Sequence, residues 1–131
     1  MKGLRAIVLS AMLAVQMPGG AAAQSRGSAA AGAATFRINC SVCHAIAPER
    51  TIIGPSLYGV VGRHAGSLSN FRYSPAMMDS TVTWTEENII EFLAAPTMKI
   101  PGTRMTFSGL ADLEQRLDVV AYLKSLRPNS E

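Results

Sequence analysis

The segment Cys40-Ser41-Val42-Cys43-His44 is the most informative part of the 131-residue chain, since it holds both cysteines and one of the two histidines. Its Cys-x-x-Cys-His pattern is typical of a site that attaches a c-type haem. Two cysteines at this spacing on a helical turn can form thioether bonds to both vinyl groups of one porphyrin, and the adjacent imidazole can then reach the iron. The segment therefore predicts one covalently bound haem c.

Other uses of the two cysteines stay open at this point. A redox-active Cys40–Cys43 disulfide of the thioredoxin kind expects a mixed α/β setting, and the chain has no βαβ pattern. A zinc site would combine the cysteines with His44 and His64, but adjacent Cys43 and His44 would have to converge on one ion. A structural disulfide would be strained by the short spacing. The haem interpretation is preferred because it also explains the long irregular loop after the motif.

Residues 1–23 have the features of a secretory signal peptide. Lys2 and Arg5 precede an apolar run from residue 6 to residue 15, and alanines at 21–23 offer a cleavage site. This run is shorter than the ~20 residues needed to span a bilayer, so we expect cleavage, export to the periplasm and no stable membrane insertion. The mature single domain would be residues 24–131, with its core at about 29–127.

Cleavage would also remove most of the net positive charge. The whole chain has 12 Lys and Arg against 9 Asp and Glu, whereas residues 24–131 keep 10 against 9, so the formal net charge falls from +3 to +1. The electrostatic footprint of a nucleic-acid-binding protein is absent from such a domain. A domain of this size has limited core volume, and a large apolar cofactor would help it to fold.

The rest of the sequence predicts helices and loops without strands. Capping residues, prolines and apolar periodicity place the expected helices from near residue 29, at 75–79, from 85 to the proline at 96, and at 111–126. Glycines and prolines interrupt any period between 47 and 70, which predicts loops with at most one short helical turn, near 56–61. A loop of this length normally wraps around something, and a bound cofactor would serve.

A haem iron held by one histidine has a sixth position to fill, and spacing alone leaves five candidates: Met77, Met78, Met98, Met105 and His64. Met105 is preferred, because the turn Pro101-Gly102-Thr103 can hold its thioether at a fixed point and Phe107 can close the pocket. A thioether favours ferrous iron, so a His/Met pair raises the reduction potential and keeps substrates from the iron. This ligand set predicts an electron carrier and not an enzyme.

From about residue 32 to residue 126 the chain resembles the class I cytochromes c, in particular mitochondrial cytochrome c and the soluble cytochromes c of photosynthetic bacteria. Beside the cysteine motif, the matching pieces are Gly32, Phe36, GPSLYGVVGR (54–63), Tyr73, Trp84, PGTRMTF (101–107) and DVVAYLK (118–124). The resemblance implies an all-α cytochrome c fold, with loops wrapped around one covalently held haem. It also implies that the N- and C-terminal helices cross through Gly32, Phe36, Val119 and Tyr122.

The same resemblance implies roles for single residues at the cofactor. It makes His44 the proximal iron ligand and Met105 the distal one, while Cys40 and Cys43 hold the porphyrin. It makes the Pro55 carbonyl the acceptor of a hydrogen bond from the His44 ring, which would fix the orientation of the imidazole.

Further cofactor contacts follow from the resemblance. Arg63, Tyr73 and Trp84 match positions that face the haem propionates, where a cation and two donors can stabilise carboxylates. Thr103 lies in the cofactor-binding turn before the methionine.

The chain also departs from the mitochondrial pattern. Phe92 stands in place of a tyrosine near the methionine sulfur, and Met77 replaces an asparagine of the same internal water network, so we expect a drier pocket. Three positions that carry lysines around the haem edge in mitochondrial members are occupied here by Asn39, Thr97 and Met98. Docking through a ring of lysines is therefore not expected, and apolar contacts near Met98 should matter more.

Together these features predict a monomeric, soluble, periplasmic carrier that transfers one electron by outer-sphere transfer through a partly exposed haem edge. Its expected partners are larger redox complexes: a quinol-oxidising complex, a terminal oxidase, a photosynthetic reaction centre or a dehydrogenase. The alternative is a haem enzyme or gas sensor in which Met105 is labile and the sixth site binds peroxide, carbon monoxide or nitric oxide.

Overall fold

The computed structural model describes residues 27–127, and the regular secondary structure of this range is helical throughout. The helices are α1 (Ala29–Asn39), α2 (Pro75–Met78), α3 (Glu86–Ala94), α4 (Pro96–Lys99) and α5 (Leu113–Ser125). Isolated antiparallel bridges join His44 to Thr51 and His64 to Thr83. The predicted all-α class is therefore confirmed. The predicted signal peptide at residues 1–23 lies outside the described residues.

Polar side chains at the N-caps explain where four of the helices begin. The hydroxyls of Ser28, Ser74 and Thr85 each accept a hydrogen bond from a backbone N–H three residues ahead. The Asp112 carboxylate accepts one from the Glu114 N–H at 2.9 Å. Each bond satisfies an amide group that has no partner inside the first helical turn.

The last helix is shorter than the sequence predicts. Periodicity indicates residues 111–126, whereas α5 begins at Leu113 and ends at Ser125. Asp112 has extended backbone angles and acts as the N-cap, so the residues before it belong to the connecting segment. The capping side chain sets the boundary here, because apolar periodicity continues beyond the helix on both sides.

One further difference, at Pro96, and one agreement, at residues 56–61, concern short segments. Pro96 ends one helix, as expected, but it also begins α4, because its fixed φ and missing N–H suit the first helical position. Residues 56–61 form turns and no helix. Ser56 is buried there and its hydroxyl donates to the Ala47 carbonyl at 2.6 Å, which ties this segment to the preceding loop.

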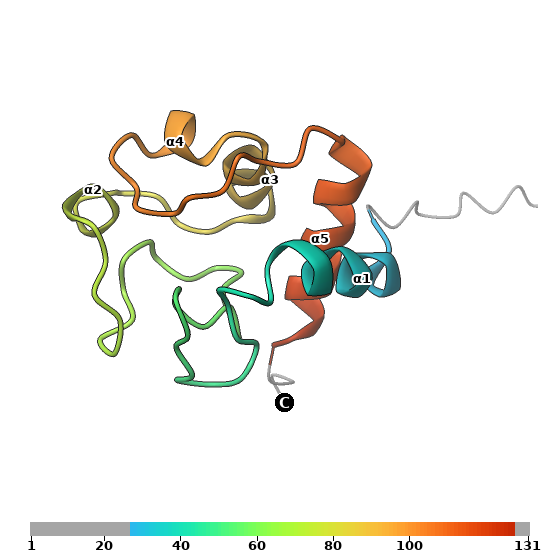
Figure 1. The fold of residues 1–131 in the computed structure, drawn as a ribbon, viewed down its shortest axis with the longest axis horizontal. Helices are drawn as coiled ribbons and strands as arrows, with labels where there is room; N and C mark the ends of the chain where they lie inside the picture. The colour runs from blue at the N-terminus through green and yellow to red at the C-terminus, as the bar shows by residue number, and fades with distance from the viewer. Residues whose placement is uncertain (1–26, 128–131) are drawn as a thin grey trace, which may run out of the picture.

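Helices α1 and α5 cross at one end of the molecule (Figure 1). A Cβ at Gly32 would collide with the Asp118 carbonyl and would lie 2.8 Å from the Tyr122 Cβ, so the close approach requires glycine. The rings of Phe36 and Tyr122 pack with their centroids 5.5 Å apart, and Val119 is 1% exposed. The predicted crossing is confirmed in these residues.

The crossed helices join two parts of the chain. In Figure 1, α3, α4 and residues 101–110 lie on one side, and the loop of residues 44–57 lies on the other. Buried side chains of the molecule form one hydrophobic cluster that includes Phe36, Val60, Trp84, Phe92, Leu93, Ile100, Val120 and Leu123. Within residues 27–127, no helix is long and apolar enough to cross a membrane.

Candidate functional site

The cysteine motif forms the turn that ends α1. The Cys40 N–H donates to the Phe36 carbonyl at 2.8 Å and so caps the helix. The N–H groups of Cys43 and His44 then donate back to the Cys40 carbonyl at 3.0 and 2.9 Å. Both thiols and the imidazole therefore start from a single turn, which is the arrangement needed for attachment to one porphyrin.

The two thiols are free, and the surroundings of Cys40 do not favour its thiolate form. Burial, with a smaller contribution from nearby Cys43, raises the pKa of the Cys40 thiol to about 11. A redox-active dithiol usually needs a lowered pKa, so this environment argues against the thioredoxin-like interpretation. Residues 27–127 also contain no cluster of three His, Cys, Asp or Glu side chains that could hold a metal ion such as zinc.

The loop after the motif holds the imidazole of His44. Its Nδ1 lies 2.8 Å from the Pro55 carbonyl oxygen, as the resemblance implies. A carbonyl can only accept, so Nδ1 carries the proton and Nε2 keeps its lone pair free to bind a metal. Burial lowers the pKa of the His44 ring, with the Pro55 hydrogen bond acting in the opposite direction. The partly buried imidazole is therefore neutral, as a metal ligand must be.

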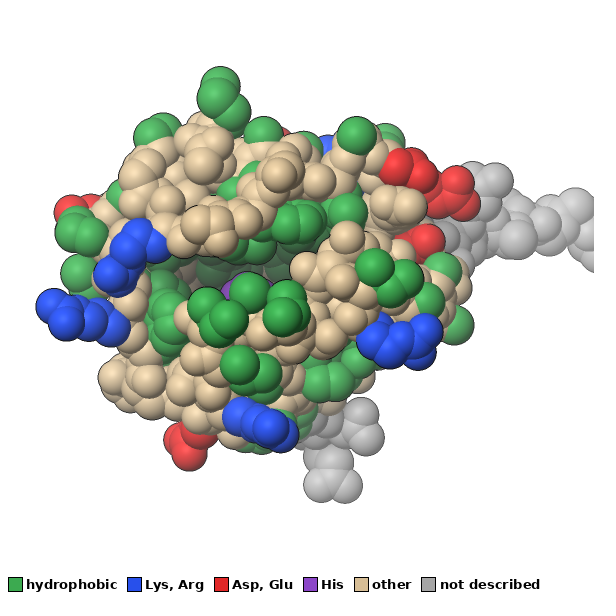
Figure 2. Space-filling model, viewed as in Figure 1, with side chains coloured by type: hydrophobic (Ala, Val, Ile, Leu, Met, Phe, Trp, Pro, Cys, Tyr) green, Lys and Arg blue, Asp and Glu red, His purple; other side chains and the backbone are tan. Residues whose placement is uncertain are grey.

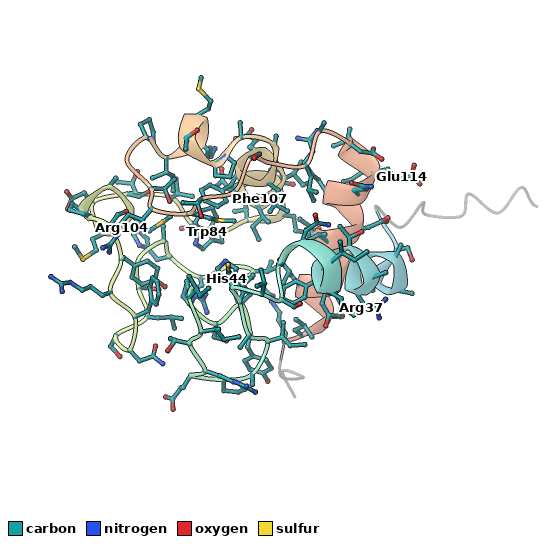
Figure 3. All side chains as sticks on the ribbon, viewed as in Figure 1. Arg37, His44, Trp84, Arg104, Phe107 and Glu114 are labelled. Atoms are coloured by element: carbon teal, nitrogen blue, oxygen red, sulfur yellow. The ribbon has the colours of Figure 1, made fainter. Side chains whose placement is uncertain are left out.

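A histidine side chain lies at the bottom of an open hollow whose walls are largely hydrophobic (Figure 2), and Figure 3 labels His44 at this place in the same view. Figure 3 shows that its side chain projects toward the part of the chain that carries Trp84 and Phe107. Several partly buried side chains pack around the hydrophobic core and remain accessible, among them Leu57, Tyr73, Met105 and Phe107. An apolar hollow with one neutral imidazole at its base suits a large, flat, apolar ligand.

The five candidates for the second axial ligand differ in exposure. Met98 is 80% exposed and Met78 is 56% exposed, so both thioethers are in solvent. His64 is exposed as well, and its Nδ1 lies 2.8 Å from the neighbouring Ala65 carbonyl. Met105 packs against the core while remaining partly accessible, and Met77 is buried. Among the five candidates, only the side chains of Met105 and Met77 therefore lie in or against the core.

A turn fixes the backbone just before Met105. The Thr103 N–H donates to the Ile100 carbonyl at 3.1 Å, and Gly102 has a φ of 89°, which is the left-handed conformation that favours glycine. The Thr103 hydroxyl oxygen accepts a hydrogen bond from the Met105 N–H at 3.3 Å. Thr103 therefore acts on the methionine main chain, a contact that the sequence pattern does not reveal.

Arg63 and Tyr73 lie close together, as their mutual influence shows. The pKa of Arg63 is lowered by burial, an effect that Tyr73 opposes, while burial raises the pKa of Tyr73 and Arg63 opposes that shift. The Arg63 guanidinium donates to the Tyr58 carbonyl at 3.1 Å and to the Ser56 carbonyl at 2.8 Å. Sequence reasoning misses this second task of Arg63, which is to hold the loop that follows Pro55.

Trp84 is joined to the same region through the backbone. Its N–H donates to the Arg63 carbonyl at 2.8 Å, and its own carbonyl accepts from the Gly62 N–H at 2.8 Å. The Trp84 ring packs edge-on against Phe92, with centroids 4.9 Å apart. The structure thus gathers the three predicted propionate-facing residues, Arg63, Tyr73 and Trp84, in one region.

The two interior departures from the mitochondrial pattern are both buried. Phe92 and Met77 are each 8% exposed, so apolar groups occupy both positions inside the molecule. The three positions that lack lysines, Asn39, Thr97 and Met98, are all exposed. These three positions therefore contribute no charged side chain to the surface.

A recess of about 480 Å³ lies next to the motif. It is lined by residues from α1, α5 and the loop after the motif: Ala33, Phe36, Arg37, Ser41, His44, Ala45, Ile46, Ala47, Arg50, Ile52 and Tyr122. Met105, Trp84 and Phe107 do not line this recess, whereas His44 does.

The residues present fit a covalently bound haem. Two free thiols and an imidazole with a free Nε2 supply the chemistry that attachment and iron ligation need. The hydrophobic walls suit the porphyrin, and Arg63 and Tyr73 are polar groups near one another that suit its carboxylates. Among residues 27–127, every buried polar side-chain atom has a hydrogen-bond partner, so no polar group needs a different ligand.

Comparison with known proteins agrees with this geometry. The family model described as Cytochrome c matches residues 29–127. A "Cytochrome c2" of Blastochloris viridis is 44% identical over 97 residues, which cover 73% of this chain and 76% of the relative. A "Cytochrome c" of Tetrahymena pyriformis is 45% identical over 100 residues, which cover 76% of this chain and 90% of the relative.

A solved structure gives the same result for the fold. The "cytochrome cH from Methylobacterium extorquens" superposes with a TM-score of 0.71 at 40% sequence identity, covering 76% of this chain and 99% of that one. The family match spans most of the chain, and the motif has the thiols that the family uses for attachment. The chain therefore belongs to the cytochrome c family and binds one haem c covalently through Cys40 and Cys43.

Proposed function

We propose that this protein is a soluble periplasmic electron carrier whose haem iron is ligated by His44 and Met105. The observation that carries the proposal is the 2.8 Å contact between His44 Nδ1 and the Pro55 carbonyl at the base of an apolar hollow. This contact places the ring proton on Nδ1 and leaves Nε2 free for the iron, while burial favours the neutral imidazole. When bound, haem c supplies a one-electron couple that transfers electrons without forming or breaking a bond to a partner.

The side chains around the hollow would act on this couple in different ways. The hydrophobic walls, together with Phe92 and Met77 in the buried core, would limit water near the cofactor and reduce the reorganisation that accompanies a change of charge. Arg63 and Tyr73 supply a cation and a hydroxyl for the propionates. Met105 fills the position through which a substrate would otherwise reach the iron.

The main alternative is a haem enzyme or gas sensor with a labile Met105. Peroxidase chemistry requires a proton-handling side chain beside the open iron position. The other histidine, His64, is exposed, and its Nδ1 is engaged by the Ala65 carbonyl. This environment favours the carrier over the enzyme.

Export and partners follow from the same proposal. The expected signal peptide at residues 1–23 would direct the chain to the periplasm, where haem attachment to cysteines takes place. The expected partners are a quinol-oxidising complex on one side, and a terminal oxidase, reaction centre or dehydrogenase on the other. Exposed Asn39, Thr97 and Met98 would make partner recognition rely less on lysine charges.

The decisive experiment is an optical spectrum of the full chain, expressed in a periplasm with haem-attachment machinery. We expect haem that stays with the denatured chain, the weak long-wavelength band of an iron–methionine bond in the oxidised state, and slow carbon monoxide binding in the reduced state. Covalent haem without that band, together with fast stoichiometric carbon monoxide binding, would support the sensor or enzyme. A mature N-terminus at Gln24, found by intact-mass analysis, would support cleavage and export.

A further inference from the structure

Gly54 lies against the ring of His44 more closely than any other residue type could. A Cβ built on Gly54 would be 2.8 Å from Nδ1 and 3.0 Å from Nε2 of the imidazole, and closer still to Cε1. Its three nearest atoms would all belong to this one ring. These distances are shorter than van der Waals contact between a carbon and ring atoms. An alanine would therefore displace the ring or the backbone.

The backbone conformation does not explain the glycine. Six glycines between residues 27 and 127 have a positive φ, namely Gly27, Gly59, Gly62, Gly66, Gly102 and Gly109, and Gly54 is not among them. The residue before a proline is restricted to extended conformations, which alanine adopts without strain. What excludes a side chain at Gly54 is therefore the imidazole itself.

Hydrogen bonds hold both Gly54 and His44 in this contact. The Gly54 N–H donates to the Cys43 carbonyl at 2.7 Å, and the Gly54 carbonyl accepts from the Ile52 N–H at 3.2 Å. The imidazole is tied to the Pro55 carbonyl through Nδ1, and the His44 backbone pairs with Thr51. Backbone bonds thus hold the glycine against the ring from both sides.

The hydrogen bond and the glycine constrain different motions. A single bond from Nδ1 to the Pro55 carbonyl fixes which nitrogen carries the proton, but it leaves the ring able to tilt about that bond. Backbone packed against the ring atoms blocks this tilt. We propose that Gly54 is a positioning residue whose missing side chain sets the plane of the His44 imidazole; this inference rests on the proposed role of His44 as an iron ligand.

The test compares Gly54→Ala with Gly59→Ala in the haem-loaded protein. Gly59 has a φ of 62°, and a Cβ at this position would have no atom within 4 Å, so alanine strains its backbone without touching a neighbour. Both variants should lose stability. Only Gly54→Ala should reorder the haem methyl resonances in the NMR spectrum of the oxidised protein, because their order follows the orientation of the axial ligands, and only it should shift the reduction potential.

A wild-type order of the haem methyl resonances in Gly54→Ala, or the same reordering in Gly59→Ala, would overturn the proposal. If Gly54→Ala does not mature, the reduced wild-type protein supplies the test, through a nuclear Overhauser contact between the Gly54 α-protons and the His44 ring. Absence of that contact would also overturn the proposal. Hyperfine shifts on the His44 ring protons of the oxidised wild type test the ligand role separately, and their absence would refute the proposed ligation itself.

Discussion

The thioether of Met105 is the side chain on which the distal half of the proposed site depends. Met105→Ala should open the sixth position, which removes the long-wavelength band, lowers the reduction potential and lets reduced protein bind carbon monoxide rapidly. Met98→Ala is the matched control, because Met98 is 80% exposed and should leave all three properties unchanged. If Met105→Ala keeps the band, the buried Met77 becomes the preferred ligand.

Arg63 has a structural task in addition to its proposed contact with the haem propionates. Arg63→Ala removes two charged hydrogen bonds to the carbonyls of Ser56 and Tyr58 and should lower the free energy of unfolding by about 1–3 kcal/mol. Denaturant unfolding of the haem-loaded protein gives this value. Arg50→Ala, which removes an exposed guanidinium, should change it by less than about 0.5 kcal/mol. Equal losses in both variants would contradict the role of these bonds.

Single residues differ in how well their roles can be predicted from sequence. The bond between His44 and Pro55 is predictable, because the resemblance to the class I cytochromes c implies it. The contact of Gly54 with the same ring is not, since a glycine before proline is equally typical of an ordinary turn. The bonds of Arg63 and Thr103 to the main chain also escape prediction, because they depend on how distant loops fold back.

At the scale of elements, Gly32 decides how closely α1 approaches α5. Gly32→Ala raises helix propensity by about 1 kcal/mol, yet it should lower the free energy of unfolding by at least about 2 kcal/mol. The reason is the collision of the new Cβ with the Asp118 carbonyl and with Tyr122. Thermal unfolding measures the change, and Ala34→Ser on the exposed face of α1 is the control. If Gly32→Ala raises the free energy of unfolding, α1 and α5 can move apart without destabilising the protein.

Lys99 links α4 to α3 next to the turn that carries Met105. Its Nζ donates to the Asn88 side-chain oxygen at 2.9 Å and pairs with Glu91. Lys99→Met should loosen the turn and speed carbon monoxide binding by about 2–5-fold, the effect expected for one partly exposed ion pair.

Lys124→Met is the matched control for this prediction, because Lys124 pairs with Glu86 between α5 and α3, away from the turn. Stopped-flow mixing of the reduced variants with carbon monoxide compares the rates. Equal rates for both variants would show that the ion pair of Lys99 does not restrain Met105.

Helix existence can be predicted better than helix bounds. Ser74 before Pro75 and Thr85 before two glutamates are local signals, and the helices begin where these signals indicate. Pro96 is ambiguous, because a proline both terminates a preceding helix and suits the first position of a new one. The turns at 56–61 depend on the bond from Ser56 to another loop, which local sequence does not specify.

At the scale of the whole molecule, the haem should be part of the core. Cys40→Ala combined with Cys43→Ala should yield an exported chain without covalent haem, and its hydrophobic hollow would then face water. We expect loss of the near-ultraviolet circular dichroism signal and of cooperative thermal unfolding. A sharp thermal transition near that of the loaded protein would show that the chain folds without its cofactor.

The crossing of α1 and α5 has a consequence for the order of events during biogenesis. The Ser28 N–H bonds the Asp118 carboxylate across 90 positions of sequence, and Gly32 packs on the same turn of α5. In a chain that leaves its translocation channel N-terminus first, Cys40 and Cys43 emerge long before α5 can lock α1 in place. Export in this direction would therefore leave both thiols accessible to attachment enzymes before α5 packs on α1, and folding would then bury them in part.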